Sequence, residues 1–174
     1  MRMKRGQVEI KGKKILVFGL ARSGVGAANL LARLGAEVTV TDRKPADQLG
    51  EYVRRLSPSV NLCLGGYPLS TNGTDMVVVS PGVPLHIEPI AKAREKGIKI
   101  IGELELAYQM VGSQKTEFLA VTGTNGKSTT TSLLDLMLRK AGFRSMVGGN
   151  IGNALTEEIL KTVSSEKSEV RSPK

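Results

Sequence analysis

The chain has 174 residues, of which 40% are apolar and only 3% aromatic, and its formal net charge is +9 at pH 7. A single cysteine excludes a disulfide within the chain, and no apolar run approaches the roughly 20 residues that span a bilayer. Six of the first fourteen residues are basic, but no aromatic residues interleave with them and no nucleic-acid module follows. We therefore expect a cytoplasmic monomer with an aliphatic core, no membrane insertion and no nucleic-acid partner.

The first predicted unit is a buried strand that leads into a glycine turn. Residues 14–19 form a continuous apolar run of the kind found in central parallel strands. Gly19-Leu20-Ala21-Arg22-Ser23-Gly24 then resembles a dinucleotide-type turn in which Ala21 replaces the second glycine. Ser23 is expected to cap a helix over 24–34. The pattern predicts the opening of a Rossmann-like domain.

A second predicted strand, 37–42, ends in a carboxylate. Asp42 lies about twenty residues past the first glycine of the turn, where nucleotide-binding folds place an acid against a ribose or base edge. Arg43 and Lys44 follow, and their charges suit a phosphate. The pattern favours nucleotide binding, with a plain glycine turn as the alternative.

The pattern of alternating strands and helices continues and predicts an α/β domain over residues 1–111, built on a parallel sheet. Its remaining elements are expected at 46–56 (helix), 60–64 (strand), 75–80 (strand), 87–96 (helix), 98–101 (strand) and 103–110 (helix). Gly82 follows the strand at 75–80, at a carboxyl end where open α/β sheets gather ligands. A plain turn accounts equally well for Ser80-Pro81-Gly82.

A second phosphate-type pattern begins after a polar break at 111–115. Residues 119–130 read as a strand, a glycine loop and the start of a helix, in which Gly123 and Gly126 let backbone N–H groups converge on an anion. Lys127 would reach the outer phosphates, and the hydroxyl of Ser128 or Thr129 would bind Mg²⁺. The usual P-loop has glycine five residues before Gly126, where this chain has valine, so the loop is a variant. The alternative is a strand–turn–helix connection that binds nothing.

This second domain is expected over 116–160, with strands at 117–122 and 143–147. Two strands and about two helices are too few to close a sheet and cover its faces. Residues 161–174 lose periodicity and are expected to be disordered.

Five segments together resemble the Mur ligase family. In chain order they are Gly19–Gly24, Thr41-Asp42-Arg43, Ser80-Pro81-Gly82, Thr122–Thr129 and Gly148-Gly149-Asn150-Ile151-Gly152. The last two blocks are specific to that family, whereas the first glycine turn alone is not. The resemblance covers about residues 6–155 and is nearest to the members that add D-glutamate to UDP-N-acetylmuramoyl-L-alanine in peptidoglycan synthesis.

The resemblance implies an ATP-driven amide ligation through an acyl phosphate, with ATP and Mg²⁺ as cofactors. It implies that Lys127 is catalytic and that Ser128 or Thr129 lies near the metal. The ATP-binding residues that it implies are Gly123, Thr124, Asn125, Gly126, Lys127, Ser128 and Thr129. The UDP-sugar-binding residues that it implies are Arg22, Ser23, Asp42, Arg43, Gly82 and Asn150.

The family continues well past residue 174, with a metal-binding carboxylate, a modified lysine and a third domain that have no counterpart here. The expected protein is therefore an amino-terminal fragment that is inactive by itself. Two alternatives stay open: a nucleotide-binding module without catalysis, and an NAD(P)-binding oxidoreductase domain suggested by the first glycine turn and Asp42. The downstream phosphate loop weighs against the oxidoreductase.

Overall fold

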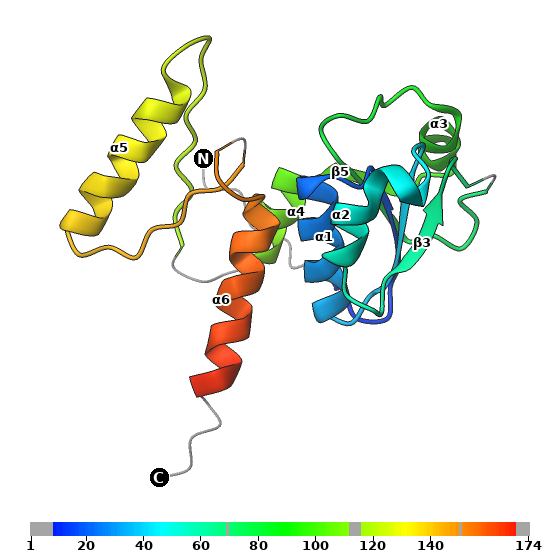
Figure 1. The fold of residues 1–174 in the computed structure, drawn as a ribbon, viewed down its shortest axis with the longest axis horizontal. Coiled ribbons are helices and arrows are strands. Elements are labelled where there is room, and N and C mark those ends of the chain that lie inside the picture. The colour runs from blue at the N-terminus through cyan, green and yellow to red at the C-terminus, as the bar shows by residue number, and fades with distance from the viewer. Residues whose placement is uncertain (1–8, 69, 112–115, 150, 170–174) are drawn as a thin grey trace.

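The computed structural model describes residues 9–68, 70–111, 116–149 and 151–169 (Figure 1). Its strands are β1 (Lys14–Phe18), β2 (Glu37–Asp42), β3 (Asn61–Leu64), β4 (Met76–Val79) and β5 (Lys99–Gly102). Its helices are α1 (Arg22–Arg33), the 3₁₀-helix η1 (Ala46–Leu49), α2 (Gly50–Arg54), α3 (Glu88–Glu95), α4 (Glu103–Met110), α5 (Lys127–Lys140) and α6 (Leu155–Glu169). The alternation of strand and helix over residues 14–110 confirms the predicted α/β domain.

The five strands form one parallel sheet in the order β3-β2-β1-β4-β5. The chain first winds outward from β1 through β2 to β3, and then returns to β4 on the other side of β1. The direction of winding thus reverses between β1 and β4. In open α/β sheets the crevice outside the carboxyl ends at such a reversal is the usual ligand site.

Both faces of the sheet are covered, as parallel sheets require. Successive residues of β1 point to opposite faces, so Ile15 and Val17 pack with α1 and α4, while Leu16 and Phe18 pack with α3. This two-sided burial explains why residues 15–18 of β1 and all of β4 are continuous apolar runs.

Helix α6 forms an additional layer outside α1 and α4 (Figure 1). Its Ile159 is buried against Leu30 of α1 and Ala107 of α4, with partly buried residues of α6 around it. The sequence predicted disorder from residue 161, but the helix continues to Glu169, which corrects that expectation for 161–169. The physical reason is that the start of α6 packs against α1 and α4, which stabilises a helix that the sequence pattern alone did not indicate.

The segment between the sheet domain and α6 contains α5 as its helix, as predicted, but the strands expected at 117–122 and 143–147 do not form. A strand needs a neighbour to satisfy its backbone N–H and C=O groups, and neither segment pairs with the sheet. Helix α5 lies apart from the sheet (Figure 1), and none of its residues is buried.

Among the residues that the structure describes, no helix combines the length and the apolar character needed to cross a membrane.

Candidate nucleotide-binding site

The turn between β1 and α1 is the tightest part of the carboxyl edge. Gly19 has φ of 92°, and a Cβ there would lie 2.8 Å from a methyl of Val83. A Cβ on Gly24 would lie only 1.9 Å from the carbonyl oxygen of Gly19. The hydroxyl of Ser80, just beyond β4, donates to that same carbonyl oxygen at 3.0 Å. Two glycines and one serine therefore hold the turn at the point where the winding reverses.

Asp42 fixes the same turn from the side of β2. One carboxylate oxygen accepts the backbone N–H of Leu20 at 2.7 Å, and the other accepts that of Lys44 at 2.9 Å. Asp42, which the sequence analysis placed against a ribose or base edge, thus also holds the loops that follow β1 and β2. Each carboxylate oxygen has a second lone pair, so these bonds leave Asp42 able to accept from a ligand hydroxyl.

Five of the six residues implied for UDP-sugar binding lie at this edge of the sheet. Arg22 and Ser23 open α1, Asp42 and Arg43 follow one another at the end of β2, and Gly82 follows β4. The side chains of Arg22 and Arg43 are exposed and supply positive charge. Asn150, the sixth, lies outside the described residues.

The expectation that Ser23 caps α1 is wrong. The helix begins at Arg22 with Ala21 as its N-cap, and no side chain bonds to the cap. Ser23 therefore sits in the first turn, half-buried, where its hydroxyl is beside the unpaired N–H groups of the helix start. Such an end favours an anion.

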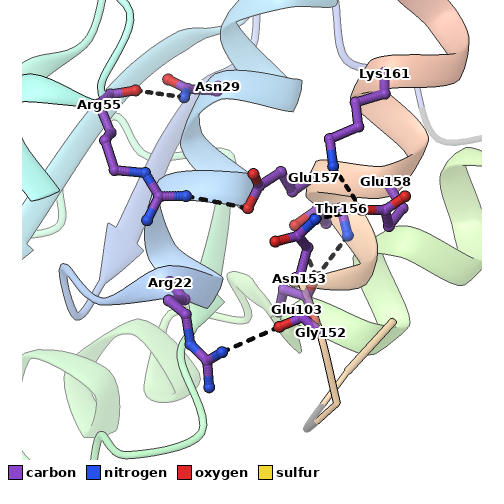
Figure 2. A network of polar contacts seen from close by, with 10 residues as sticks. All are labelled: Arg22, Asn29, Arg55, Glu103, Gly152, Asn153, Thr156, Glu157, Glu158 and Lys161. Carbon is purple, nitrogen blue, oxygen red and sulfur yellow. Dashed lines mark hydrogen bonds and ion pairs between the residues drawn. The ribbon is translucent and has the colours of Figure 1, made fainter. Parts of the chain in front are cut away.

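Gly152, far along the chain, reaches the same edge. The guanidinium of Arg22 donates to the carbonyl oxygen of Gly152 at 3.0 Å, across 130 residues of sequence (Figure 2). The sequence did not predict two residues that anchor this region, Glu103 and Thr156, which are buried against each other. No local pattern indicates a pairing between residues so distant in sequence.

The predicted phosphate loop lies on the separate segment that carries α5. Gly126 is the N-cap of α5 with φ of 76°, as predicted for a glycine loop, and Gly123 has φ of 148°. The ammonium of Lys127 donates to the carbonyl oxygens of Gly123 and Thr124. The first turn contains no acidic residue, so nothing there repels a phosphate.

A cluster of three or more His, Cys, Asp or Glu residues placed to hold a metal ion is absent from the described part of the chain. The hydroxyls of Ser128 and Thr129 in the first turn of α5 are nevertheless compatible with Mg²⁺ carried by a nucleotide, because such Mg²⁺ takes few protein ligands and several waters.

Comparisons with known proteins identify the sheet domain. Residues 13–102 match the family described as Mur ligase MurD-like, N-terminal domain. The chain belongs to this family. The match spans the whole sheet, from the start of β1 to the end of β5, and with it Asp42 and the Gly19–Gly24 turn.

Full-length relatives extend the MurD-like similarity beyond the sheet. The chain is 47% identical over 154 residues to the UDP-N-acetylmuramoylalanine–D-glutamate ligase of Geotalea daltonii, which covers 87% of this chain and 33% of that protein. It is 46% identical over 149 residues to the ligase of the same name from Pelotomaculum thermopropionicum, covering 84% of this chain and 32% of that protein. The chain thus spans about a third of the length of these relatives.

Among solved structures, the UDP-N-acetylmuramate–alanine ligase MurC of Thermotoga maritima aligns with a TM-score of 0.48 and 23% identity, covering 75% of this chain and 30% of that one.

Proposed function

We propose that this MurD-like chain binds UDP-N-acetylmuramoyl-L-alanine and is the amino-terminal part of a ligase that joins D-glutamate to it with ATP. The observation that carries the proposal is the hydrogen bond by which Asp42 holds the Gly19–Gly24 turn at the winding reversal, in a domain of the MurD-like family. The names of the relatives supply the substrate.

The chemistry of the crevice suits a uridine diphosphate. The start of α1 offers backbone N–H groups and the positive end of its dipole to a phosphate, and the exposed guanidinium of Arg22 adds charge. Asp42 offers acceptor oxygens to the ribose or the base on the opposite side. Ala21, in place of a glycine, keeps a Cβ where an NAD pyrophosphate would approach the backbone most closely, which disfavours the oxidoreductase alternative.

In the proposed ligase the Gly123–Thr129 loop holds ATP. Lys127 would exchange the two backbone carbonyls that it now contacts for phosphate oxygens, and Ser128 or Thr129 would meet the accompanying Mg²⁺. ATP supplies the phosphoryl group that activates the substrate carboxylate. The charge of Lys127 would hold and neutralise the phosphates while that carboxylate is aligned.

Isothermal titration calorimetry of the 174-residue chain tests the proposal. We expect saturable binding of UDP-N-acetylmuramoyl-L-alanine and of UDP, and none of NADH. Asp42→Ala should weaken both uridine ligands by about tenfold or more, since it removes hydrogen bonds to a charged acceptor. Asp47→Ala, an exposed aspartate on η1, is the matched control and should bind as the wild type does.

Phosphate release from ATP completes the experiment, and we expect none from this chain alone with both substrates present. A chain that binds neither uridine ligand would overturn the proposal. Saturable NADH binding would replace it with the oxidoreductase alternative.

A further inference from the structure

A hollow of about 480 Å³ lies between the second half of α1, the loop that follows α2, and α6. Its volume is that of a small-molecule site. None of the described residues that line it belongs to the uridine or ATP sites proposed above. From Arg22 to Arg33 helix α1 rises about 16 Å, so the hollow lies at the far end of this helix from the Gly19–Gly24 turn.

Part of the lining is apolar and held in place by the core. Ala32 of α1 and Leu56 pack against the buried residues on one face of the sheet. Leu160 of α6 packs against the cluster that joins α6 to α1 and α4. All three side chains are half-buried, so an apolar group that covered them would gain from leaving water.

The polar wall of the hollow is fixed before any ligand arrives. The side-chain amide of Asn29 donates to the carbonyl oxygen of Arg55 at 2.8 Å (Figure 2). Its side-chain oxygen accepts the backbone N–H of Ser57, also at 2.8 Å. Asn29 therefore attaches the loop after α2 to α1, and a ligand would not have to order this loop.

The charge in the lining is positive. Two exposed arginines, Arg33 and Arg55, contribute guanidinium groups, and the lining contains no Asp or Glu. Arg55 also pairs with Glu157 of α6 at 3.2 Å (Figure 2). A guanidinium has five N–H donors, so this pair leaves donors of Arg55 for a ligand. The hydroxyl of Ser57, which lies 2.9 Å from that of Ser59, is a further polar group of the lining.

We propose that this hollow binds a small organic phosphate, a phosphomonoester whose apolar part covers the aliphatic side chains of the lining. The planar guanidinium groups of Arg33 and Arg55 match phosphate oxygens in pairs, and the Ser57 hydroxyl adds a donor. A phosphomonoester has three terminal oxygens for these donors, whereas a carboxylate has two. The site is separate from the proposed uridine site and does not depend on it.

A titration with phenyl phosphate, followed by ¹⁵N NMR of the 174-residue chain in phosphate-free buffer, tests the proposal. We expect saturable shifts of the backbone N–H of Ser57 and of the side-chain amide of Asn29. Inorganic phosphate, which lacks the ring, and benzoate, which lacks the phosphate, should each bind about fivefold more weakly or less. Shifts confined to the Gly19–Gly24 turn or the Gly123–Thr129 loop would overturn the proposal.

Substitutions at the hollow separate specific binding from general attraction to a basic chain. Arg33→Gln should weaken phenyl phosphate by about fivefold, because it removes charge-assisted hydrogen bonds. Arg54→Gln is the matched control: it removes the same charge from an exposed arginine of α2 that does not line the hollow, and should change the affinity by less than twofold. Glu157→Gln should strengthen binding, because it removes the carboxylate that competes for Arg55.

Arg33 lies in the last turn of α1, where its charge also offsets the negative end of the helix dipole. Arg33→Lys distinguishes this role from phosphate binding. Lysine keeps the charge and with it the stability in urea, but it lacks the planar fork and should recover only part of the affinity. Equal losses in Arg33→Gln and Arg54→Gln, or shifts that grow without saturating, would overturn the site and leave the proposed function untouched.

Discussion

Gly24 illustrates how one missing methyl group determines the geometry of the site. The added Cβ of Gly24→Ala would meet a backbone carbonyl at 1.9 Å, so either the turn or the first turn of α1 must move. We expect the free energy of unfolding to fall by at least about 2 kcal/mol, together with loss of UDP binding. Urea denaturation and calorimetry measure the two effects.

The matched control for this substitution is Gly82→Ala. Gly82 lies at the same edge of the sheet, but an added Cβ there meets nothing within 4 Å. The free energy of unfolding of Gly82→Ala should stay within about 0.5 kcal/mol of the wild-type value. Equal losses of unfolding free energy at the two glycines would contradict the steric account of the turn.

Asp75 contributes to stability in a pH-dependent way at the opposite edge of the sheet. The backbone N–H of Lys14 donates to its carboxylate at 2.8 Å, and the Lys13 ammonium lies 3.6 Å away. These contacts hold the pKa of Asp75 below its usual value, and the hydrogen bond from Lys14 has the largest effect. A lowered native pKa stabilises the fold above about pH 4, and this stabilisation is lost as pH falls through the native pKa.

Between about pH 5 and pH 2, the free energy of unfolding of Asp75→Asn should therefore fall by less than that of wild type. Urea midpoints across this range measure it. Lys13→Gln removes only the nearby positive charge, which lowers the pKa of Asp75 less than the Lys14 hydrogen bond does. This variant should keep most of the wild-type dependence of stability on pH. An identical slope in wild type and Asp75→Asn would exclude the proposed linkage.

At the scale of elements, α1 and α5 both carry leucines but differ in how far those leucines are buried. Leu31 of α1 is fully buried under the sheet, whereas Leu133 of α5 is 55% exposed. Leu31→Ala should cost about 2–5 kcal/mol, because it leaves a cavity in the core. Leu133→Ala should change the unfolding free energy of this chain by less than about 0.5 kcal/mol.

Thermal or urea unfolding of the two leucine variants, each compared with wild type, measures how much each helix contributes to stability. A large loss in Leu133→Ala would mean that α5 packs onto the domain in solution, in disagreement with the exposed helix seen here.

For the molecule as a whole, the sequence predicted the sheet domain well because its signals are local. Apolar runs marked β1 and β4, alternating valines marked β2, and glycines marked several of the turns. The same reasoning failed at 117–122, which contains an apolar run, and at 143–147, which contains three apolar residues, because neither segment has a neighbouring strand to pair with. Strand formation there depends on a partner, which a local pattern does not contain.

The site was predictable to a similar extent. The glycine turn and Asp42 were identified from spacing alone, and most of the remaining residues at the edge came from a family resemblance. Neither the spacing of residues nor the family resemblance identified Glu103 and Thr156. Their contact joins segments 53 residues apart, and neither residue belongs to a recognisable pattern. Helix α6 was missed as a layer of the sheet domain for the same reason.

The return of α6 to the sheet domain has a consequence for chain entropy. The chain leaves the domain after Phe118, whose ring packs on Tyr108 of α4, and returns to it at Ala154, so the part that carries α5 is a loop fixed to the domain at both ends. The entropy of closing such a loop grows only with the logarithm of its length, by about 0.6 kcal/mol per doubling. The sheet domain can therefore carry an excursion of very different length at nearly constant stability, provided that both tethers stay in place.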